Sequence, residues 1–250
     1  MNEKLTKQSH FSWRDIIVIV GYFVVTFTIS LLVNIVVMLV VGFTNNGVMS
    51  NPDDFMSTIL PTTTAWSLFI GGLINVIGVF LMYWQFIKDS WVRFWQSWKK
   101  NIPIIIAGYI VVMLFMYLFD TYVSSETSAN QTLIEETLNN LSVFEMILMQ
   151  ISMVFFAPIV EEFLCRKAMF GSYKHIKIVN ILLFIASSVF FGLLHYGFDG
   201  NFLVLIPYMF MGMAMATVYW LTDNIFTSIG LHFMNNGIAT LLLLLSQLMG

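Results

Sequence analysis

Charged residues are scarce in this sequence. Asp, Glu, Lys and Arg make up 10% of its 250 residues, whereas hydrophobic residues make up 58%. Soluble domains usually carry about 25% charged residues, so the composition excludes an ordinary soluble protein. We expect no nucleic-acid partner. The composition instead predicts an all-α, polytopic transmembrane helix bundle whose main surroundings are the lipid bilayer.

Cysteine is almost absent as well, and the single residue Cys165 excludes an internal disulfide. A cleavable signal peptide is not indicated either. The first apolar run is about twice as long as the hydrophobic region of a signal peptide, and no small-residue cleavage site follows it. Repeats, low-complexity segments and a soluble domain are not apparent. We therefore expect one integral membrane domain with N-terminal helices and loops at 1–142 and a C-terminal helical core at 143–250.

Seven apolar segments each approach the ~20 residues that a helix needs to cross the hydrocarbon core. They are residues 16–43, 64–87, 102–122, 143–170, 178–197, 202–222 and 225–249. The sequence thus predicts about seven spans, within a range of six to eight. Between the second and third spans, residues 86–101 place Trp91, Trp95 and Trp98 at helical spacing among basic residues. This pattern predicts an amphipathic helix at the membrane surface.

Lys and Arg are missing from the loops at 44–63 and 123–142. All eleven basic residues fall on the other predicted side of the membrane: Lys4, Lys7, Arg14, Lys88, Arg93, Lys99, Lys100, Arg166, Lys167, Lys174 and Lys177. Positive charge is retained on the cytoplasmic side, so the N-terminus is predicted to be cytoplasmic and, with seven spans, the C-terminus outside. In the loop at 123–142, Thr132 and Glu135 predict the capping box of a short helix.

The residue usage also points to an origin. Only three of the eleven basic residues are Arg, while Ile, Met, Phe and Asn are plentiful. This usage is typical of an AT-rich bacterial genome, and we therefore expect a multi-pass protein of a bacterial plasma membrane.

The segment 143–170 carries three charges at predicted membrane depth. Glu162 and Arg166 are four residues apart with the glutamate first, which is the favourable order for an ion pair on one helix face. Glu161 lies about 100° further round the helix and has no cation at that spacing, which suits general acid–base chemistry. Pro158 is expected to kink the helix and re-aim both glutamates. The alternative is a solvated helix end.

Two further spans carry imidazole groups. His195 lies near the end of the fifth span, one turn after Phe191, where an interfacial histidine is the alternative. His232 and Asn236 share one face of the seventh span, where a hydrogen bond between helices is the alternative. With Glu161, these are nearly the only strongly polar groups outside the loops. Such groups at membrane depth are usually functional, and their convergence would assemble one carboxylate, two imidazoles and one amide.

The depths of these groups, counted along the helices, do not agree. Glu161 would lie ~14 Å from the cytoplasmic end of its span, His195 ~25 Å and His232 ~10 Å. Tilted or kinked helices, or a wide water-filled cavity, would be needed to bring them together. We expect a cavity that opens to the cytoplasmic half.

Three motifs follow one another on separate apolar helices. They are EExxxR, present as EEFLCR at 161–166; FxxxH, present as FGLLH at 191–195; and a His followed four residues later by Asn, present as HFMNN at 232–236. In this order they resemble the family of CAAX proteases and bacteriocin-processing enzymes, also called the Abi family. The resemblance covers about residues 143–240, so the segment 143–250 is expected to be the catalytic core.

The resemblance implies an intramembrane endopeptidase that works without a covalent intermediate or a cofactor. Glu161 and His195 would activate a water molecule. His232 and Asn236 would stabilise the oxyanion, and the ion pair of the first motif would support the site. The substrate would be a peptide or a membrane protein, in peptide maturation, bacteriocin immunity or signalling. A sensor kinase or a peptide exporter would be a fitting partner.

Other chemistries remain open. Glu161, His195 and His232 form a legitimate zinc set with a water in the fourth position, although the sequence has no HExxH motif. Cys165 is a poor nucleophile because no base is placed beside it. A non-enzymatic immunity protein or regulatory scaffold would keep the fold without the activity. A transporter is disfavoured because no inverted repeat is visible.

Overall fold

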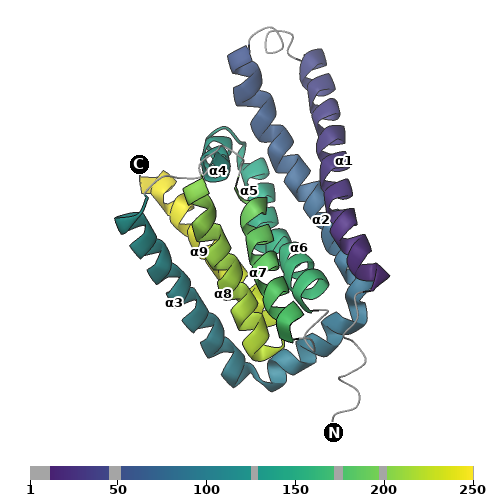
Figure 1. Ribbon diagram of the computed structural model, residues 1–250. Helices are drawn as coiled ribbons and strands as arrows, with labels where there is room; N and C mark the ends of the chain where they lie inside the picture. Colours follow the sequence, from purple (N-terminus) through teal and green to yellow (C-terminus); the bar gives the residue numbers. More distant parts are fainter. Residues whose placement is uncertain (1–11, 45–51, 125–128, 172–176, 197–201, 250) are drawn as a thin grey trace.

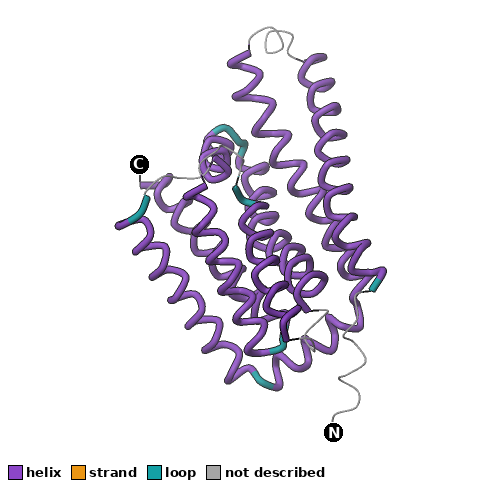
Figure 2. Tube along the Cα trace, in the orientation of Figure 1, coloured by secondary structure: helices purple, strands orange, loops and turns teal. Residues whose placement is uncertain are grey.

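The computed structural model describes residues 12–44, 52–124, 129–171, 177–196 and 202–249. Within these ranges the chain is helical, with no strand (Figure 2). The α-helices are α1 (Trp13–Thr44), α2 (Pro52–Gln96), α3 (Trp98–Tyr122), α4 (Ala129–Asn139), α5 (Val143–Ile151), α6 (Ala157–Glu162), α7 (Lys177–Leu194), α8 (Leu205–Thr222) and α9 (Ile225–Met249). A π-helical segment, Ser152–Phe156, joins α5 to α6, and a second one, Phe163–Phe170, continues α6, so that the four form one long helix. A short 3₁₀ turn, Phe202–Val204, precedes α8.

Six of these helices are long and apolar enough to cross a membrane. They cover Trp13–Thr44, Ile59–Gln96, Trp98–Tyr122, Val143–Phe170, Phe202–Thr222 and Ile225–Leu245. A seventh apolar helix, Ile178–Leu194, is shorter and ends just before His195. The prediction of an all-α, multi-pass bundle is therefore confirmed, and the shortest predicted span is also the shortest in the structure.

The helices form a packed body and a leaning hairpin (Figure 1). α1 and α2 run side by side and diverge from the other helices toward the upper end of the view. On α1 only Asp15 and Val18 are buried, as expected for a helix that faces lipid over most of its length. α7, α8, α9 and the α5–α6 helix pack together in the body, with α3 against α8 and α9. α1 begins at one end of the bundle and α9 finishes at the other (Figure 1).

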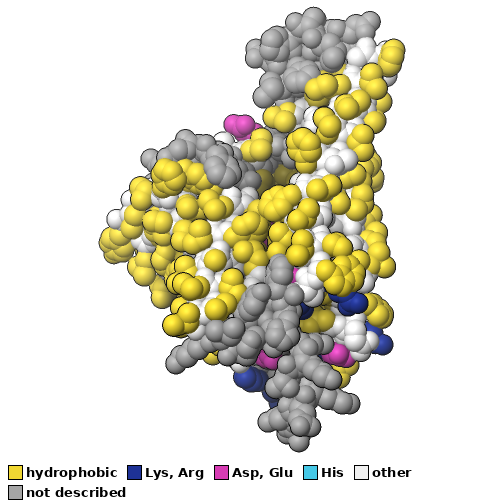
Figure 3. All heavy atoms as spheres, turned by 45° about the vertical axis from the view of Figure 1, so that its right-hand side comes forward, with side chains coloured by type: hydrophobic (Ala, Val, Ile, Leu, Met, Phe, Trp, Pro, Cys, Tyr) yellow, Lys and Arg dark blue, Asp and Glu magenta, His cyan; other side chains and the backbone are white. Residues whose placement is uncertain are grey.

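α2 turns sharply near its end. Tyr83 has a non-helical backbone, with φ −122° and ψ 20°, and the helix beyond it runs across the base of the bundle to α3 (Figure 1). Trp91 and Trp95 on this last part are half exposed. The predicted helix is thus present, and its place at a membrane surface stays a prediction. On the face in Figure 3, the Lys and Arg side chains gather at this same end of the molecule.

A buried carboxylate holds this end of the bundle together. Asp15 of α1 is fully buried and accepts a 2.5 Å hydrogen bond from the Tyr83 hydroxyl. Its Oδ1 also lies 3.3 Å from Nζ of Lys167. Asp15 therefore ties α1 and the bend of α2 to the helix segment that follows the two glutamates.

The predicted capping box at Thr132 is wrong. α4 already begins at Ala129, so Thr132 lies inside the helix rather than at its N-cap. A capping box occurs instead at the start of α5. There Ser142 Oγ accepts from the backbone N–H of Glu145, and the Glu145 carboxylate accepts from the backbone N–H of Ser142. This box fixes the first turn of the helix that carries Glu161 and Glu162.

The irregularity expected at Pro158 takes the form of π-helical segments. Ser152–Phe156 is π-helical immediately before the proline, and Phe163–Phe170 is π-helical immediately after Glu162. Pro158 has no backbone N–H to donate, and a wider turn accommodates the missing bond without ending the helix. Such π segments inside α-helices are frequent at functional sites.

Candidate active site

Glu162 and Arg166 form a buried ion pair, as the spacing predicted. Arg166 Nε lies 3.1 Å from Glu162 Oε2, and both side chains are fully buried. Arg166 also donates through Nη2 to the carbonyl of Gly212 on α8, at 3.1 Å. Its guanidinium lies 5.4 Å from the ring centre of Phe191 on α7, within range of a cation–π contact. The arginine therefore connects the glutamate helix to two neighbouring helices.

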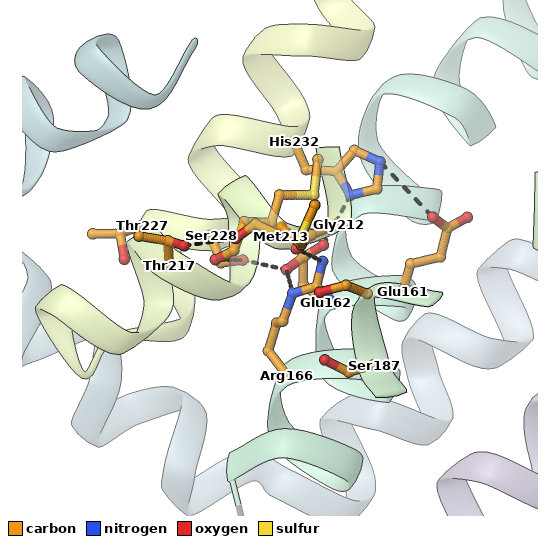
Figure 4. A network of polar contacts seen from close by, with 12 residues as sticks. Glu161, Glu162, Arg166, Ser187, Gly212, Met213, Thr217, Thr227, Ser228 and His232 are labelled. Atoms are coloured by element: carbon orange, nitrogen blue, oxygen red, sulfur yellow. Dashed lines mark hydrogen bonds and ion pairs between the residues drawn. The ribbon is translucent and has the colours of Figure 1, made fainter. Parts of the chain in front are cut away.

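Glu162 has further partners on α9 (Figure 4). The Ser228 hydroxyl donates to Oε2, and His232 Nδ1 lies 3.2 Å from Oε1. The ionised carboxylate can only accept hydrogen bonds, so His232 carries a proton on Nδ1. The carboxylate thereby fixes the tautomer and orientation of the imidazole, as it does in many histidine sites. Glu162 thus orients His232 in addition to pairing with Arg166.

Glu161 points away from this network and toward the two imidazoles. Its Oε2 lies 3.7 Å from His195 Nε2 and 3.8 Å from His232 Nε2. Only 8% of the residue is exposed, and Oε2 makes no hydrogen bond with another described group. Both distances exceed a direct hydrogen bond and fit a small bridging molecule. The structure therefore brings the predicted carboxylate and both predicted histidines to one point.

His195 is held in a defined orientation. Its Nδ1 lies 3.0 Å from the carbonyl oxygen of Phe191. A carbonyl only accepts, so Nδ1 carries the proton, and Nε2 of the neutral ring presents a lone pair toward Glu161. The ring stacks between Phe191 and Tyr208, with centroid distances of 4.7 and 5.2 Å.

Asn236 lies on the wall of the same site, and its amide is bonded to the backbone. Its Nδ2 donates to the carbonyl of Met153 at 2.9 Å, and its Oδ1 accepts from Asn235 at 3.2 Å. Met153 belongs to the first π-helical segment, so this bond ties α9 to the irregular part of the glutamate helix. An amide NH₂ group has two donors, which leaves one N–H for another acceptor.

A cavity of about 410 Å³ lies beside this cluster. Its wall includes Glu161, His195 and Asn236 and reaches Gln131 of α4 and Leu243 of α9. In Figure 1, α4 lies at the end of the bundle opposite the bend of α2. The expectation of a cavity toward the cytoplasmic, basic half is therefore wrong.

Packing at the basic end explains this difference. The buried side chains that fill that end are Val18, Val79, Tyr83, Ile87, Phe163, Phe170, Tyr219 and Ile225. Aromatic rings from α2, α8 and the second π segment thus occupy the space below the glutamates. The open volume is left on the side of α4.

Comparison with known proteins agrees with this site. Residues 143–238 match the family model described as Type II CAAX prenyl endopeptidase Rce1-like. Over this range the chain is similar to the CAAX protease family. The match begins at the first residue of α5 and ends within α9, so it contains all three motifs. No curated protein and no solved structure matches the chain. Similarity to the CAAX protease family supports a protease activity at the membrane.

The same cluster of side chains bears on metal binding. Glu161, His195 and His232 supply nitrogen and oxygen ligands that zinc accepts. Among the described residues, however, no group of three His, Cys, Asp or Glu side chains is spaced to hold a metal ion. The buried Cys165 is not part of the cluster.

Sequence reasoning missed Ser228 and Gly212. Ser228 lies four residues before His232 on α9, so the same spacing rule that paired Glu162 with Arg166 places it on the face of the histidine. That spacing was a usable signal. Gly212 contributes through its backbone, and nothing in the sequence marks its carbonyl as the partner of Arg166.

Proposed function

We propose that this protein is an intramembrane endopeptidase in which Glu161 and His195 activate a water molecule. The observation that carries the proposal is the 3.7 Å separation between Glu161 Oε2 and His195 Nε2. Both atoms are acceptors, so they do not bond to each other, and a water between them donates one hydrogen to each. Such a water is oriented with its lone pairs free to attack a carbonyl carbon.

In the first step, the water oxygen bonds to the carbonyl carbon of the scissile peptide while Glu161 takes one proton. The developing oxyanion needs donors placed toward it, and removing one such donor typically costs ~3–4 kcal/mol. His232 supplies Nε2–H in the form that carries a proton on both ring nitrogens, with Nδ1–H donating to the Glu162 carboxylate. The second N–H of Asn236 is the other donor.

In the second step, Glu161 returns the proton to the leaving nitrogen as the C–N bond breaks. The products are a carboxylic acid and an amine, and no covalent enzyme intermediate forms. This sequence of steps requires no cofactor.

We further propose the cellular setting. The protein is a multi-pass protein of a bacterial plasma membrane with its N-terminus in the cytoplasm, because all eleven basic residues fall on one predicted side. Its substrate is a membrane-associated peptide or a membrane-protein segment, in peptide maturation, bacteriocin immunity or signalling. A sensor kinase or a peptide exporter is the kind of partner that such a substrate requires.

A zinc peptidase is the second candidate, and the convergence of Glu161 with two imidazoles is the observation in its favour. In that case Glu161, His195 and His232 would hold the metal, which would supply Lewis-acid activation of the water.

The test is cleavage of a peptide mixture by the protein in liposomes. Peptides from a digest of bacterial membrane proteins are incubated with the protein, with and without a strong zinc chelator, and new termini are identified by mass spectrometry. We expect chelator-resistant cleavage that is lost in Glu161→Gln and in His195→Ala. Glu136→Gln, the same change at an exposed glutamate of α4, is the matched control.

Full activity of Glu161→Gln would show that another group is the base. Cleavage that the chelator stops and zinc restores would support the metal reading. Absence of cleavage in the wild type, in a protein that remains folded, would contradict the protease assignment.

A further inference from the structure

A second cavity meets the first at Glu161. It has a volume of about 250 Å³ and lies between α1, α2 and the glutamate helix. The two cavities share six wall residues: Tyr22, Thr64, Leu68, Met153, Ala157 and Glu161. The unbonded Oε2 of Glu161 therefore lies where both cavities come together.

Polar side chains line this second cavity at membrane depth. Thr26 and Ser30 lie one turn apart on α1, and Ser67 and Asn75 face them from α2. Asn75 donates to the Thr26 hydroxyl at 3.4 Å, and the buried Ser67 hydroxyl makes no hydrogen bond with a described group. Such groups are costly beside lipid tails. A peptide backbone supplies a partner for the Ser67 hydroxyl and further polar contacts for this face, which an acyl chain does not.

Gly71 of α2 lies on the wall of the second cavity. The nearest atoms to an added Cβ are in the side chain of Ile29, at 3.8 Å. This is ordinary van der Waals contact, so the backbone tolerates a side chain there. In Figure 3, the column formed by α1 and α2 stands apart from the rest of the molecule in its upper half.

We propose that the substrate binds as an extended peptide that runs through both cavities, with the scissile bond over Glu161. One part lies in the larger cavity, against α4, α8 and α9. The other lies in the smaller cavity, between the polar faces of α1 and α2. This inference rests on the proposed function, and it adds that cleavage is internal: residues are required on both sides of the bond.

Photo-crosslinking tests this path without relying on catalysis. The inactive Glu161→Gln protein carries a photoreactive benzoylphenylalanine at Thr26 of the small cavity or at Thr240 of the large one. A third protein carries it at Gly78 of α2, which lies outside both cavity walls and has open space around it. The probe is a pool of biotinylated 12- to 20-residue peptides from a membrane-protein digest, and palmitate is the competitor.

We expect the same peptides to crosslink at positions 26 and 240 and not at 78, with no competition by palmitate. Crosslinking at one cavity only, or at neither, would overturn the proposal. Loss of the position-26 crosslink with palmitate would assign the small cavity to an acyl chain instead.

Kinetics gives a second, independent measure. Gly71→Leu adds a bulky side chain at the wall of the small cavity, and Gly78→Leu is the matched control on the same helix. We expect Gly71→Leu to lower kcat/KM on long peptides by about tenfold or more, equivalent to ~1.4 kcal/mol. Peptides shortened on the side that occupies the small cavity should be cleaved equally, and slowly, by Gly71→Leu and by the wild type. Equal loss on long and short peptides would contradict the path.

Thr26→Val keeps the shape of the side chain and removes its hydroxyl, so it is the alternative variant if Gly71→Leu does not fold. Its expected effect is a roughly two- to tenfold rise in KM for long peptides only, and no rise would contradict the path.

Crosslinking at both cavities in a protein whose wild type does not cleave would keep the path and overturn the protease function. Wild-type cleavage without crosslinking would keep the protease function and overturn the path.

Discussion

Removing the charge of Arg166 is expected to lower the free energy of unfolding. In Arg166→Leu, the fully buried Glu162 loses the cation 3.1 Å away. Breaking a buried ion pair on one side typically costs 3–5 kcal/mol, because the other charge remains uncompensated. Ser228 and His232 still donate to Glu162, which places the expected loss near the lower end, about 3 kcal/mol.

The double variant Glu162→Leu with Arg166→Leu separates stability from activity. Replacing both partners of a buried pair by apolar side chains is often neutral or stabilising, so we expect the double variant to be more stable than Arg166→Leu alone, by about 1–3 kcal/mol. Cleavage should not return, because His232 has then lost the carboxylate that holds its Nδ1.

The measurement is an unfolding titration with SDS in mixed micelles, followed by circular dichroism, with peptide cleavage assayed on the same preparations. Arg93→Leu is the control, because this arginine is exposed at the base of the bundle, and its loss should stay within about 0.5 kcal/mol. If the double variant is less stable than Arg166→Leu, or if it cleaves peptides like the wild type, the reasoning about Glu162 is refuted.

Four further outcomes are expected. Glu161→Asp withdraws the carboxylate by about one C–C bond, ~1.5 Å, and should lower kcat by about two orders of magnitude; a kcat near that of the wild type would contradict the geometry. Ser228→Ala removes a donor to Glu162 and should cost about 1.5–3 kcal/mol in the SDS titration, with a smaller loss in Ser228→Thr. Gly212→Ala would put a Cβ 3.0 Å from the carbonyl oxygen of Ser188, so its thermal unfolding should occur at a lower temperature. A strong chelator should leave the cleavage rate unchanged, whereas loss that zinc reverses would favour the metal site.

Features that depend on local spacing could be predicted from the sequence. The apolar runs, the i, i+4 pair of Glu162 and Arg166, and the separation of Glu161 from that pair all follow from helix geometry. The start of α5 next to residue 143 was also predictable, because Ser142 and Glu145 form a capping box that the sequence displays. Thr132 and Glu135 have the same spacing, and only the earlier start of α4 excludes them.

Features that depend on packing between helices could not be predicted in this way. The depth mismatch among Glu161, His195 and His232 came from equating each helix end with a membrane boundary, which tilted helices of unequal length do not respect. The side on which the cavity lies depends on where aromatic rings such as Phe163 and Phe170 find space. The partner of Arg166 on α8 is a backbone carbonyl, which has no signature in the sequence.

The two adjacent glutamates show how packing assigns different roles to the same residue type. Both oxygens of Glu162 are engaged, Oε1 by His232 and Oε2 by Arg166 and Ser228, so this carboxylate is fixed and its charge is balanced. One position earlier, a rotation of about 100° points Glu161 away from the same arginine and toward two imidazole nitrogens and two cavities. An unbonded oxygen is costly in an apolar interior, and that cost is offset if the atom binds a water or a substrate group in the working enzyme. The charge on Glu162 orients His232, and His232 in turn forms one side of the space that Glu161 faces. The ion pair and Glu161 thus belong to one connected cluster, in which the ion pair sets the geometry that the proposed role of Glu161 requires.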